Sequence, residues 1–435
     1  MLYELSKIAI NDVSKYCDTY EVFIEQSKEL ELNAEKTELN FAKEEINLGI
    51  GIGVIKDSKL GYAYTSNINE IEKTAKQACL NSKINEKDEY FEFATASKFK
   101  KVKNTYDKRI DDVTLDDGRD YLSQMFNIAK EEKCDVSSAQ FSTGLGERLI
   151  VNSNGLEAYD KSTGFGGYIA VNAKKDGELS NAYDGESKCL YDLNPEKIAK
   201  DSCKLAKDSI GGKNIETDDM PVVLNYHAGS GLLNNFLNGI SGDNVLRGRS
   251  ILKDKIGEDI TSKNLSIYDD NSYEGGLASA SCDSEGTPSQ KTKIVEDGVL
   301  KGFIYNIYNA NKAECESTSN GFRESYAGIP GVSTSNVIFD FKNMKDLSEI
   351  KKGIIVSNVL GAHTANPISG DFSVEVSNGF LIENGEITSP IKKAMISGNI
   401  YEGLKNCNGI KSEIKQYGSF IIPQIIIENL RVIGN

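Results

Sequence analysis

The sequence predicts an α+β fold, with a duplicated helix and strand-meander region at residues 1–212 followed by a mainly β domain with a core helix at residues 220–435. In the first region, the order helix, strand meander, glycine-bearing strand and helix occurs twice, at an offset of roughly 115 residues, which indicates an internal duplication. A polar stretch beginning at Gly211-Gly212 then reads as a linker. Beyond this stretch, turn dipeptides and β-branched runs predominate, which favours strands.

The first unit begins with a helical pattern at residues 2–16, after which the apolar period changes to two, as in strands. Gly49, Gly51 and Gly53 alternate, so they line one face of a strand and predict the close approach of another backbone or helix. They do not precede a helix, as the glycines of a phosphate-binding loop would. The other predicted elements of this unit are strands at 21–25, 29–33, 38–41, 49–55 and 60–65, a hairpin turn at 56–59 and a helix at 69–81.

The second unit carries clear helix-start signals. Thr114 is the expected N-cap of a helix at residues 115–133, and Asn194 caps another helix that has Pro195 at its first position and runs to about residue 210. A polar, Lys- and Asp-rich surface connection at 83–110 precedes this unit. Between its two helices, strands are predicted at 136–141, 148–151, 156–160 and 164–173.

The C-terminal half has the turn chemistry of a β domain. Asp297-Gly298 and Asn384-Gly385 each separate two apolar runs and predict hairpins. A short helix is expected near residues 306–314. Pro423 interrupts the last apolar run and predicts a strand edge or a bulge there, because proline cannot donate a ladder hydrogen bond.

The composition and net charge of the chain indicate which classes of partner it can bind. The chain is 39% hydrophobic and carries a formal net charge of −15, with no run of Lys or Arg. Such an acidic surface repels phosphate groups, so we expect binding to neither nucleic acid nor an anionic membrane. The eight cysteines are irregularly spaced, and the N-terminus has no apolar run of signal-peptide length, which predicts a cytoplasmic protein.

One stretch, residues 221–259, stands out within the predicted β domain. A short apolar run at 222–224 predicts a strand, and a helical pattern follows it. The opposite face of this helix carries Asn234, Asn235 and Asn238, whose plain interpretation is a solvated polar face. The apolar face is formed by Leu232, Leu233, Phe236, Leu237 and Ile240.

This stretch, with SGDNVLRGRS and DKIGE after the helix, resembles the TldD/PmbA family, and its PmbA/TldE branch in particular. The segments DSEGTPSQKTKIVEDGVLKGFI and NPISGDFSVEVSNGFLIENGEI also match the patterns of that branch. The resemblance covers nearly the whole chain and is most specific at residues 221–400. The family has carried the label of a modulator of DNA gyrase and is related to metallopeptidases.

The resemblance implies a degenerate metal site. In the TldD branch this helix carries a His-Glu-x-x-x-His sequence that looks like a peptidase zinc site. Here Asn234 stands at the first His, Asn235 at the Glu and Gly239 at the second His. An amide is a weak, neutral zinc ligand, glycine has no side chain, and Asn235 cannot act as a general base. The family also uses a Cys in a Met-Cys-Gly setting, whereas Cys407 here lies in LKNCNGI.

By resemblance, the chain would be a subunit without catalytic or metal-binding residues of its own. A TldD-like partner in a heterodimer would supply zinc and the Glu base, and the pair would act on unfolded peptides. Two alternatives remain open. The first is a stand-alone peptidase built on Asp283, Glu285 and His363, although a turn with solvated acids also explains the first two. The second is a non-enzymatic homodimer that binds peptides or a regulator. The other histidine, His227, is expected to be an exposed or capping residue.

Overall fold

The computed structural model describes residues 1–434, and its N-terminal half is built on one six-stranded antiparallel sheet. The strand order is β3-β2-β1-β4-β5-β6, so the first strands of the two repeated units, β1 and β4, pair at the centre. The strands are β1 (Tyr20–Glu35), β2 (Glu38–Lys56), β3 (Lys59–Thr65), β4 (Asp135–Asn152), β5 (Glu157–Lys175) and β6 (Glu178–Lys188).

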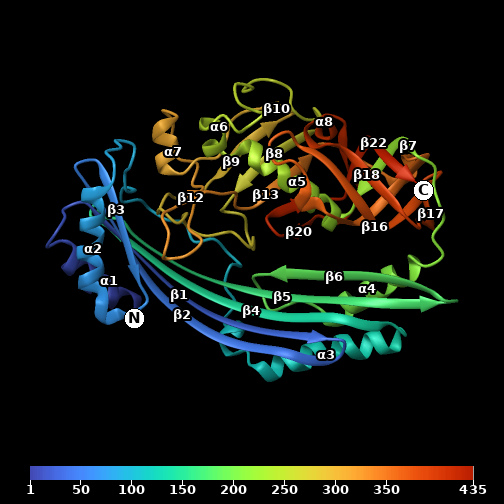
Figure 1. Cartoon of the computed structure of the whole chain (residues 1–435), viewed down its shortest axis with the longest axis horizontal. Helices are drawn as coiled ribbons and strands as arrows, with labels where there is room; N and C mark the ends of the chain where they lie inside the picture. The colour runs from blue at the N-terminus through green and yellow to red at the C-terminus, as the bar shows by residue number, and fades with distance from the viewer. Residues whose placement is uncertain (435) are drawn as a thin grey trace.

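Four helices cover this sheet in two pairs. Helices α1 (Leu2–Val13) and α2 (Ile71–Ile84) lie at one end, and α3 (Leu115–Glu131) and α4 (Pro195–Asp208) lie at the other (Figure 1). Each pair packs its own apolar cluster against the sheet. Each repeat therefore contributes two helices and three strands, and the predicted fold class with its duplication is confirmed.

The strands are longer than the apolar patterns predict. The segments predicted at 21–25 and 29–33 are halves of the single strand β1, and the later predicted segments merge in the same way, two by two, into β2, β4 and β5. The exception is the segment predicted at 60–65, which corresponds to the separate strand β3. Polar stretches between the apolar points make each strand look interrupted in the sequence. The sixth strand, β6, was not predicted, because its sequence ELSNAYDGESK is polar and lacks alternation.

The predicted caps and turns are present. The Thr114 side chain accepts a hydrogen bond from the Asp117 N–H, and the Asp117 side chain accepts one from the Thr114 N–H, which completes a capping box. Asn194 accepts from the Lys197 N–H at the start of α4. At the β2–β3 hairpin, Asp57 and Ser58 have φ values of 50° and 58°, so both central turn residues are left-handed.

The C-terminal half contains two larger sheets, ordered β10-β9-β8-β13-β21-β20 and β14-β19-β22-β18-β16-β15-β7 with β17 paired to β16, and a small sheet of β11 and β12. Its helices are α5 (Tyr226–Ile240), α6 (Gly242–Leu246), α7 (Ile307–Lys312) and α8 (Ile400–Lys405). Its strands are β7 (Asp218–Leu224), β8 (Leu265–Asp270), β9 (Lys291–Glu296), β10 (Val299–Leu300), β11 (Gly321–Phe322), β12 (Gly331–Val332), β13 (Val337–Phe341), β14 (Met344–Lys345), β15 (Lys352–Leu360), β16 (Asp371–Glu383), β17 (Glu386–Pro390), β18 (Ala394–Asn399), β19 (Cys407–Ile410), β20 (Lys415–Tyr417), β21 (Phe420–Ile422) and β22 (Ile425–Gly434).

Five strands of the second of these sheets form a closed ring. The order β22-β18-β16-β15-β7 is completed because β7 also pairs with β22. Pro423 lies between β21 and β22, where the chain leaves one sheet and enters the other, so it is in a connection and not at the strand edge or bulge that the sequence predicts. Both predicted hairpins are present, with φ of 53° at Asp297 and 54° at Asn384.

The C-terminal half lies along one side of the long N-terminal strands (Figure 1). The alternating glycines of β2 allow a close approach, as predicted. A Cβ on Gly51 would lie 2.6 Å from the carbonyl oxygen of Tyr326, and one on Gly49 would overlap the Tyr326 ring. A small apolar cluster, including Phe23 and Cys282, bridges the two halves. Among residues 1–434, no helix has both the length and the apolar character needed to cross a bilayer.

Candidate functional site

The helix α5 starts directly after β7 and is fixed at its beginning by a local cap. The Asn225 side chain accepts a hydrogen bond from the Tyr226 N–H at 2.9 Å. The predicted apolar face packs into the main core of the C-terminal half, with all of its residues buried except Leu237, which is half-buried. Asn234 is exposed, but Asn235 is 9% exposed and donates to the Leu232 carbonyl at 3.3 Å. The interpretation of a wholly solvated asparagine face is therefore wrong at Asn235.

A tyrosine fills the space beside Gly239. A Cβ at this position would lie 2.4 Å from the Tyr401 hydroxyl oxygen, and the same ring packs against Gly370 on another side. The hydroxyl is buried and has no hydrogen-bond partner in the described part of the chain. Burial raises the pKa of Tyr401 to about 12. A side chain as large as His at position 239 would displace this ring.

The residues Asn234, Asn235 and Gly239 do not suit a zinc ion. Zinc in proteins takes imidazole, thiolate or carboxylate ligands, and here the positions offer two amides and a glycine whose side-chain space holds a tyrosine ring. Over residues 1–434, no group of three or more His, Cys, Asp or Glu side chains is arranged to hold a metal ion. Asn234, Asn235 and Gly239 therefore do not provide the ligands that a zinc-dependent step would need.

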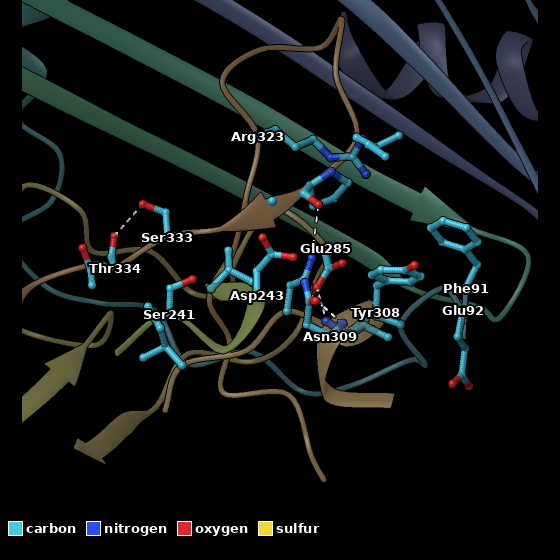
Figure 2. A pocket seen from close by; sticks show the side chains of 18 of the residues that line it. Phe91, Glu92, Ser241, Asp243, Glu285, Tyr308, Asn309, Arg323, Ser333 and Thr334 are labelled. Atoms are coloured by element: carbon cyan, nitrogen blue, oxygen red, sulfur yellow. Dashed lines mark hydrogen bonds between the residues drawn. The ribbon is translucent and has the colours of Figure 1, made fainter. Parts of the chain in front are cut away.

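The outer face of α5 borders a cavity of about 880 Å³ between the two halves of the molecule. Asn234, Leu237 and Asn238 contribute from α5, and Glu21, Gly53 and Tyr62 contribute from the N-terminal sheet. The segment at 91–94 and the elements around α7 complete the wall, and Figure 2 shows Phe91, Tyr308, Glu285 and Arg323 around the space. This size is within the range of ligand-binding pockets.

A buried ion pair joins the two halves at this cavity. The Arg323 guanidinium contacts the Glu21 carboxylate, and the side chains are 3% and 4% exposed. Arg323 also donates to the carbonyl oxygens of Ser284 and Gly328, each at 3.1 Å. The central carbon of its guanidinium lies 4.8 Å from the centroid of the Phe23 ring. Each nitrogen of this guanidinium therefore has a partner, which holds the loop after β11 against β1.

Asp283 is a structural carboxylate. It is 7% exposed and accepts hydrogen bonds from the backbone N–H groups of Glu285, Thr287 and Gly321, each at 2.9 Å. Burial raises the pKa of Asp283, and these three donors oppose that rise. The interpretation of this segment as a turn with solvated acids is wrong, since Asp283 and Glu285 are both buried.

Glu285 differs from Asp283 in having a free oxygen. It is also 7% exposed, and its Oε2 accepts a hydrogen bond from the Ile307 N–H at 2.8 Å. Among residues 1–434, no hydrogen bond reaches Oε1. Burial raises the pKa of Glu285 well above its ordinary value, and the neighbouring charge of Asp283 raises it further. A buried carboxyl with a raised pKa at a cavity is typical of functional sites.

The remaining sequence candidates lie elsewhere. His363 is exposed on the short turn η4 (Ala362–Thr364) and is not among the described residues that line the cavity, so the structure does not bring it to Asp283 and Glu285. Cys407 is buried, donates to the Leu404 carbonyl at 3.2 Å, and has its pKa raised to about 12 by burial. His227 is half-buried rather than exposed: its Nε2 lies 3.0 Å from Asp184 Oδ1, and its ring contacts Tyr417. Asn225 provides the cap that was expected of His227.

Sequence reasoning missed Arg323, Glu21 and Tyr401. Each lies in a segment whose local pattern is ordinary, so only the tertiary contacts reveal the three residues.

Comparison with known proteins places the chain among peptidase relatives. Models of the PmbA/TldA metallopeptidase family match it three times: domain 1 at residues 20–82, the central domain at 108–210 and the C-terminal domain at 217–434. An uncharacterized protein of Methanocaldococcus jannaschii is 35% identical over 413 residues, which cover 94% of this chain and 95% of that protein. A protein of the same organism named as a metalloprotease is 28% identical over 395 residues, which cover 86% of each.

The fold has a close counterpart among solved structures. The crystal structure of TldE from Thermococcus kodakarensis superposes with a TM-score of 0.90 at 25% identity, covering 99% of this chain and 100% of that one. The relatives and the solved structure share nearly the full length of this chain. The chain therefore belongs to the TldD/PmbA family, as its sequence resemblance predicted.

Proposed function

We propose that this chain is the PmbA/TldE-type subunit of a TldD/TldE-type zinc metallopeptidase that acts on unfolded peptides in the cytoplasm. In this proposal the chain forms part of the peptide-binding space, and a TldD-like subunit supplies the metal and the general base. The observation that carries the proposal is the environment of α5. This helix presents Asn234 to a large cavity, and Tyr401 occupies the space beside Gly239.

The residues of this chain support binding rather than bond cleavage. The cavity wall combines amides, aromatic rings and two paired arginines, which can hold a peptide by hydrogen bonds and apolar contact. Asn235 is buried and cannot titrate near neutral pH, so it cannot take a proton from water. Asp283 is engaged by three backbone donors, and His363 lies apart, so we do not extend the proposal to a stand-alone peptidase.

The metal content of the lone chain tests the proposal directly. We expect the chain, purified without chelators and analysed by elemental mass spectrometry, to contain far less than one zinc per chain and to leave unfolded peptides intact. A stoichiometric zinc ion, together with chelator-sensitive cleavage by the lone chain, would show that the proposal is wrong.

The partner is tested by capture from the native host. We expect the tagged chain to retain a second protein that carries His-Glu-x-x-x-His, and we expect the reconstituted pair to cleave peptides in a zinc-dependent manner. Retention of a second copy alone, with no peptidase activity, would favour the non-enzymatic homodimer instead.

A further inference from the structure

We propose that the cavity beside α5 binds a cationic group of a peptide, either its α-ammonium group or a Lys or Arg side chain, with Glu285 Oε1 as the acceptor. This inference rests on the proposed function, because it names the substrate chemistry that the peptide-binding space of this subunit selects. The acceptor lies in the wall of the cavity and belongs to a side chain that is more than nine-tenths buried.

The charges of the cavity wall favour a cation over an anion. Four carboxylates and two guanidiniums line the space, and no lysine or histidine is among the described lining residues. Arg323 is paired with Glu21, and Arg247 Nε lies 2.9 Å from a carboxylate oxygen of Asp243. The pairing leaves two carboxylates without a cation, Glu92 at the exposed rim and Glu285 inside. A further cation can enter without displacing either arginine.

The Glu285 side chain is held in place by contacts on the side that faces away from the cavity. Its Oε2 accepts from the first N–H of α7, and its side chain packs on Gly321, where a Cβ would lie 2.5 Å from Oε2. The carboxylate therefore cannot swing away from the cavity to find another partner. The oxygen without a described hydrogen bond is available to a ligand, and a charge-assisted hydrogen bond to a buried carboxylate is stronger than a neutral one.

The rest of the wall suits a peptide that carries this cation. Phe91 and Tyr308 stack with ring centroids 4.5 Å apart, and Ile304 and Ile329 add aliphatic surface. The Asn234 and Asn238 amides lie on the α5 side, where they can reach peptide N–H and C=O groups. Apolar walls with a few convergent polar groups are typical of specific ligand sites.

The ionisation of Glu285 depends on whether a cation is bound in the cavity. The charged groups around its carboxyl are Asp283 from its own loop, Glu21 from β1 and Arg323 from the segment after β11; the first two raise its pKa and Arg323 lowers it. An ammonium group that enters the cavity would act in the same direction as Arg323 and favour the ionised form. Binding of a cation should therefore release a proton, and the affinity should increase as the pH is raised through the titration of Glu285.

The experiment measures peptide binding by fluorescence anisotropy, with the full chain alone and in the complex with its captured partner. The probe is an alanine pentapeptide with a free α-amine and a C-terminal fluorophore. Three N-acetylated versions, with a central Ala, Lys or Glu, separate the α-ammonium group from a side-chain cation. We expect at least one cationic peptide to bind roughly tenfold or more tighter than the acetylated neutral and acidic peptides. The Lys peptide, measured from acidic to neutral pH, gives the pH dependence.

The Glu285→Gln variant should lose this preference, because Gln keeps an acceptor for the Ile307 N–H but not the charge. Glu296→Gln, at a half-buried site at the end of β9, removes the same charge outside the cavity, and this variant should keep the preference. If Glu285→Gln unfolds, the wild-type chain still decides the question, since n-butylammonium should displace the probe and n-butanol should not.

Three outcomes would overturn the inference: equal binding of charged and neutral peptides, a preference that survives in Glu285→Gln, or no binding of any cationic peptide. Zinc content and partner capture do not depend on Glu285, so failure of the proposed function is seen separately.

Discussion

Two acidic residues, two positions apart in the chain, have different roles because of what surrounds each carboxylate. Asp283 has three backbone donors and is occupied by the folding of its own loop. Glu285 has one donor and one free oxygen. The sequence singled out both residues as a pair of acids, but it could not rank them, because donors such as the Gly321 and Ile307 N–H groups come from distant segments.

The contact between Tyr401 and Gly239 predicts how substitutions at these two residues change the stability of the protein. Tyr401→Phe should stabilise the protein by about 1 kcal/mol, because it removes a buried hydroxyl that has no described partner. Gly239→Ala should destabilise it by about 1–3 kcal/mol, since the new Cβ would lie 2.4 Å from that hydroxyl oxygen. Urea-induced unfolding of both single variants measures the two effects.

The double variant Gly239→Ala/Tyr401→Phe provides the control. Because the hydroxyl is the nearest clashing atom, the pair should be clearly less destabilised than the sum of the single effects predicts. Strict additivity would mean that the tyrosine does not occupy the space beside position 239.

At the scale of elements, helices were predicted more accurately than strands. The helices have local start signals, such as the capping box at Thr114 and the Asn194-Pro195 pair, and those signals act within one turn. The strands of the first sheet are stabilised by neighbours far away in sequence. The polar strand β6 is paired along its whole length with β5, and nothing in its own residues shows this.

The glycine-bearing strand β2 yields the second prediction. Gly51→Ala should destabilise the protein by about 1–3 kcal/mol, because the new Cβ would clash with the Tyr62 hydroxyl and with the Tyr326 carbonyl oxygen. The Tyr326 carbonyl belongs to the backbone and cannot rotate away as a side chain can. The thermal midpoint, followed by circular dichroism, should fall accordingly.

Gly164→Ala in β5 is the matched control. It lies on the glycine-bearing strand of the second repeat, and among the described residues no heavy atom beyond its chain neighbours comes within 4 Å of the position that the new methyl group would take. This variant should leave the midpoint unchanged or raise it slightly, since Ala restricts the unfolded chain. An equal loss in the two variants would show that the contact with Tyr326 does not explain the effect.

At the scale of the whole molecule, the family, the duplication and α5 could be predicted from the sequence, but the cavity could not. The cavity exists because the two halves meet, and its wall joins residues as far apart as Glu21 and Arg323, which are separated by 302 positions. Neither residue stands in a recognisable pattern. Their pairing follows from the docking of whole domains, which local apolar periodicity does not describe.

The ion pair between Arg323 and Glu21 predicts how the stability changes when one or both charges are removed. Arg323→Met should destabilise the protein by about 3–5 kcal/mol, because it leaves the Glu21 carboxylate buried without its cation. The double variant Glu21→Leu/Arg323→Met should recover much of that loss, since it removes both buried charges. Chemical denaturation with separate probes in the two halves measures both effects. A single variant that is as stable as the wild type would mean that the charges are hydrated in solution.

The ring of five strands joins the first strand after the linker to the last strand of the chain. During synthesis on a ribosome, β7 emerges about two hundred residues before its partner β22, so the ring cannot close until β22 has been made. Until then β7 and β18 keep open edges that can pair with other chains. A polypeptide that ends before Ile425 therefore leaves these two edges open to aggregation, and pairing of β22 with both strands is what removes them.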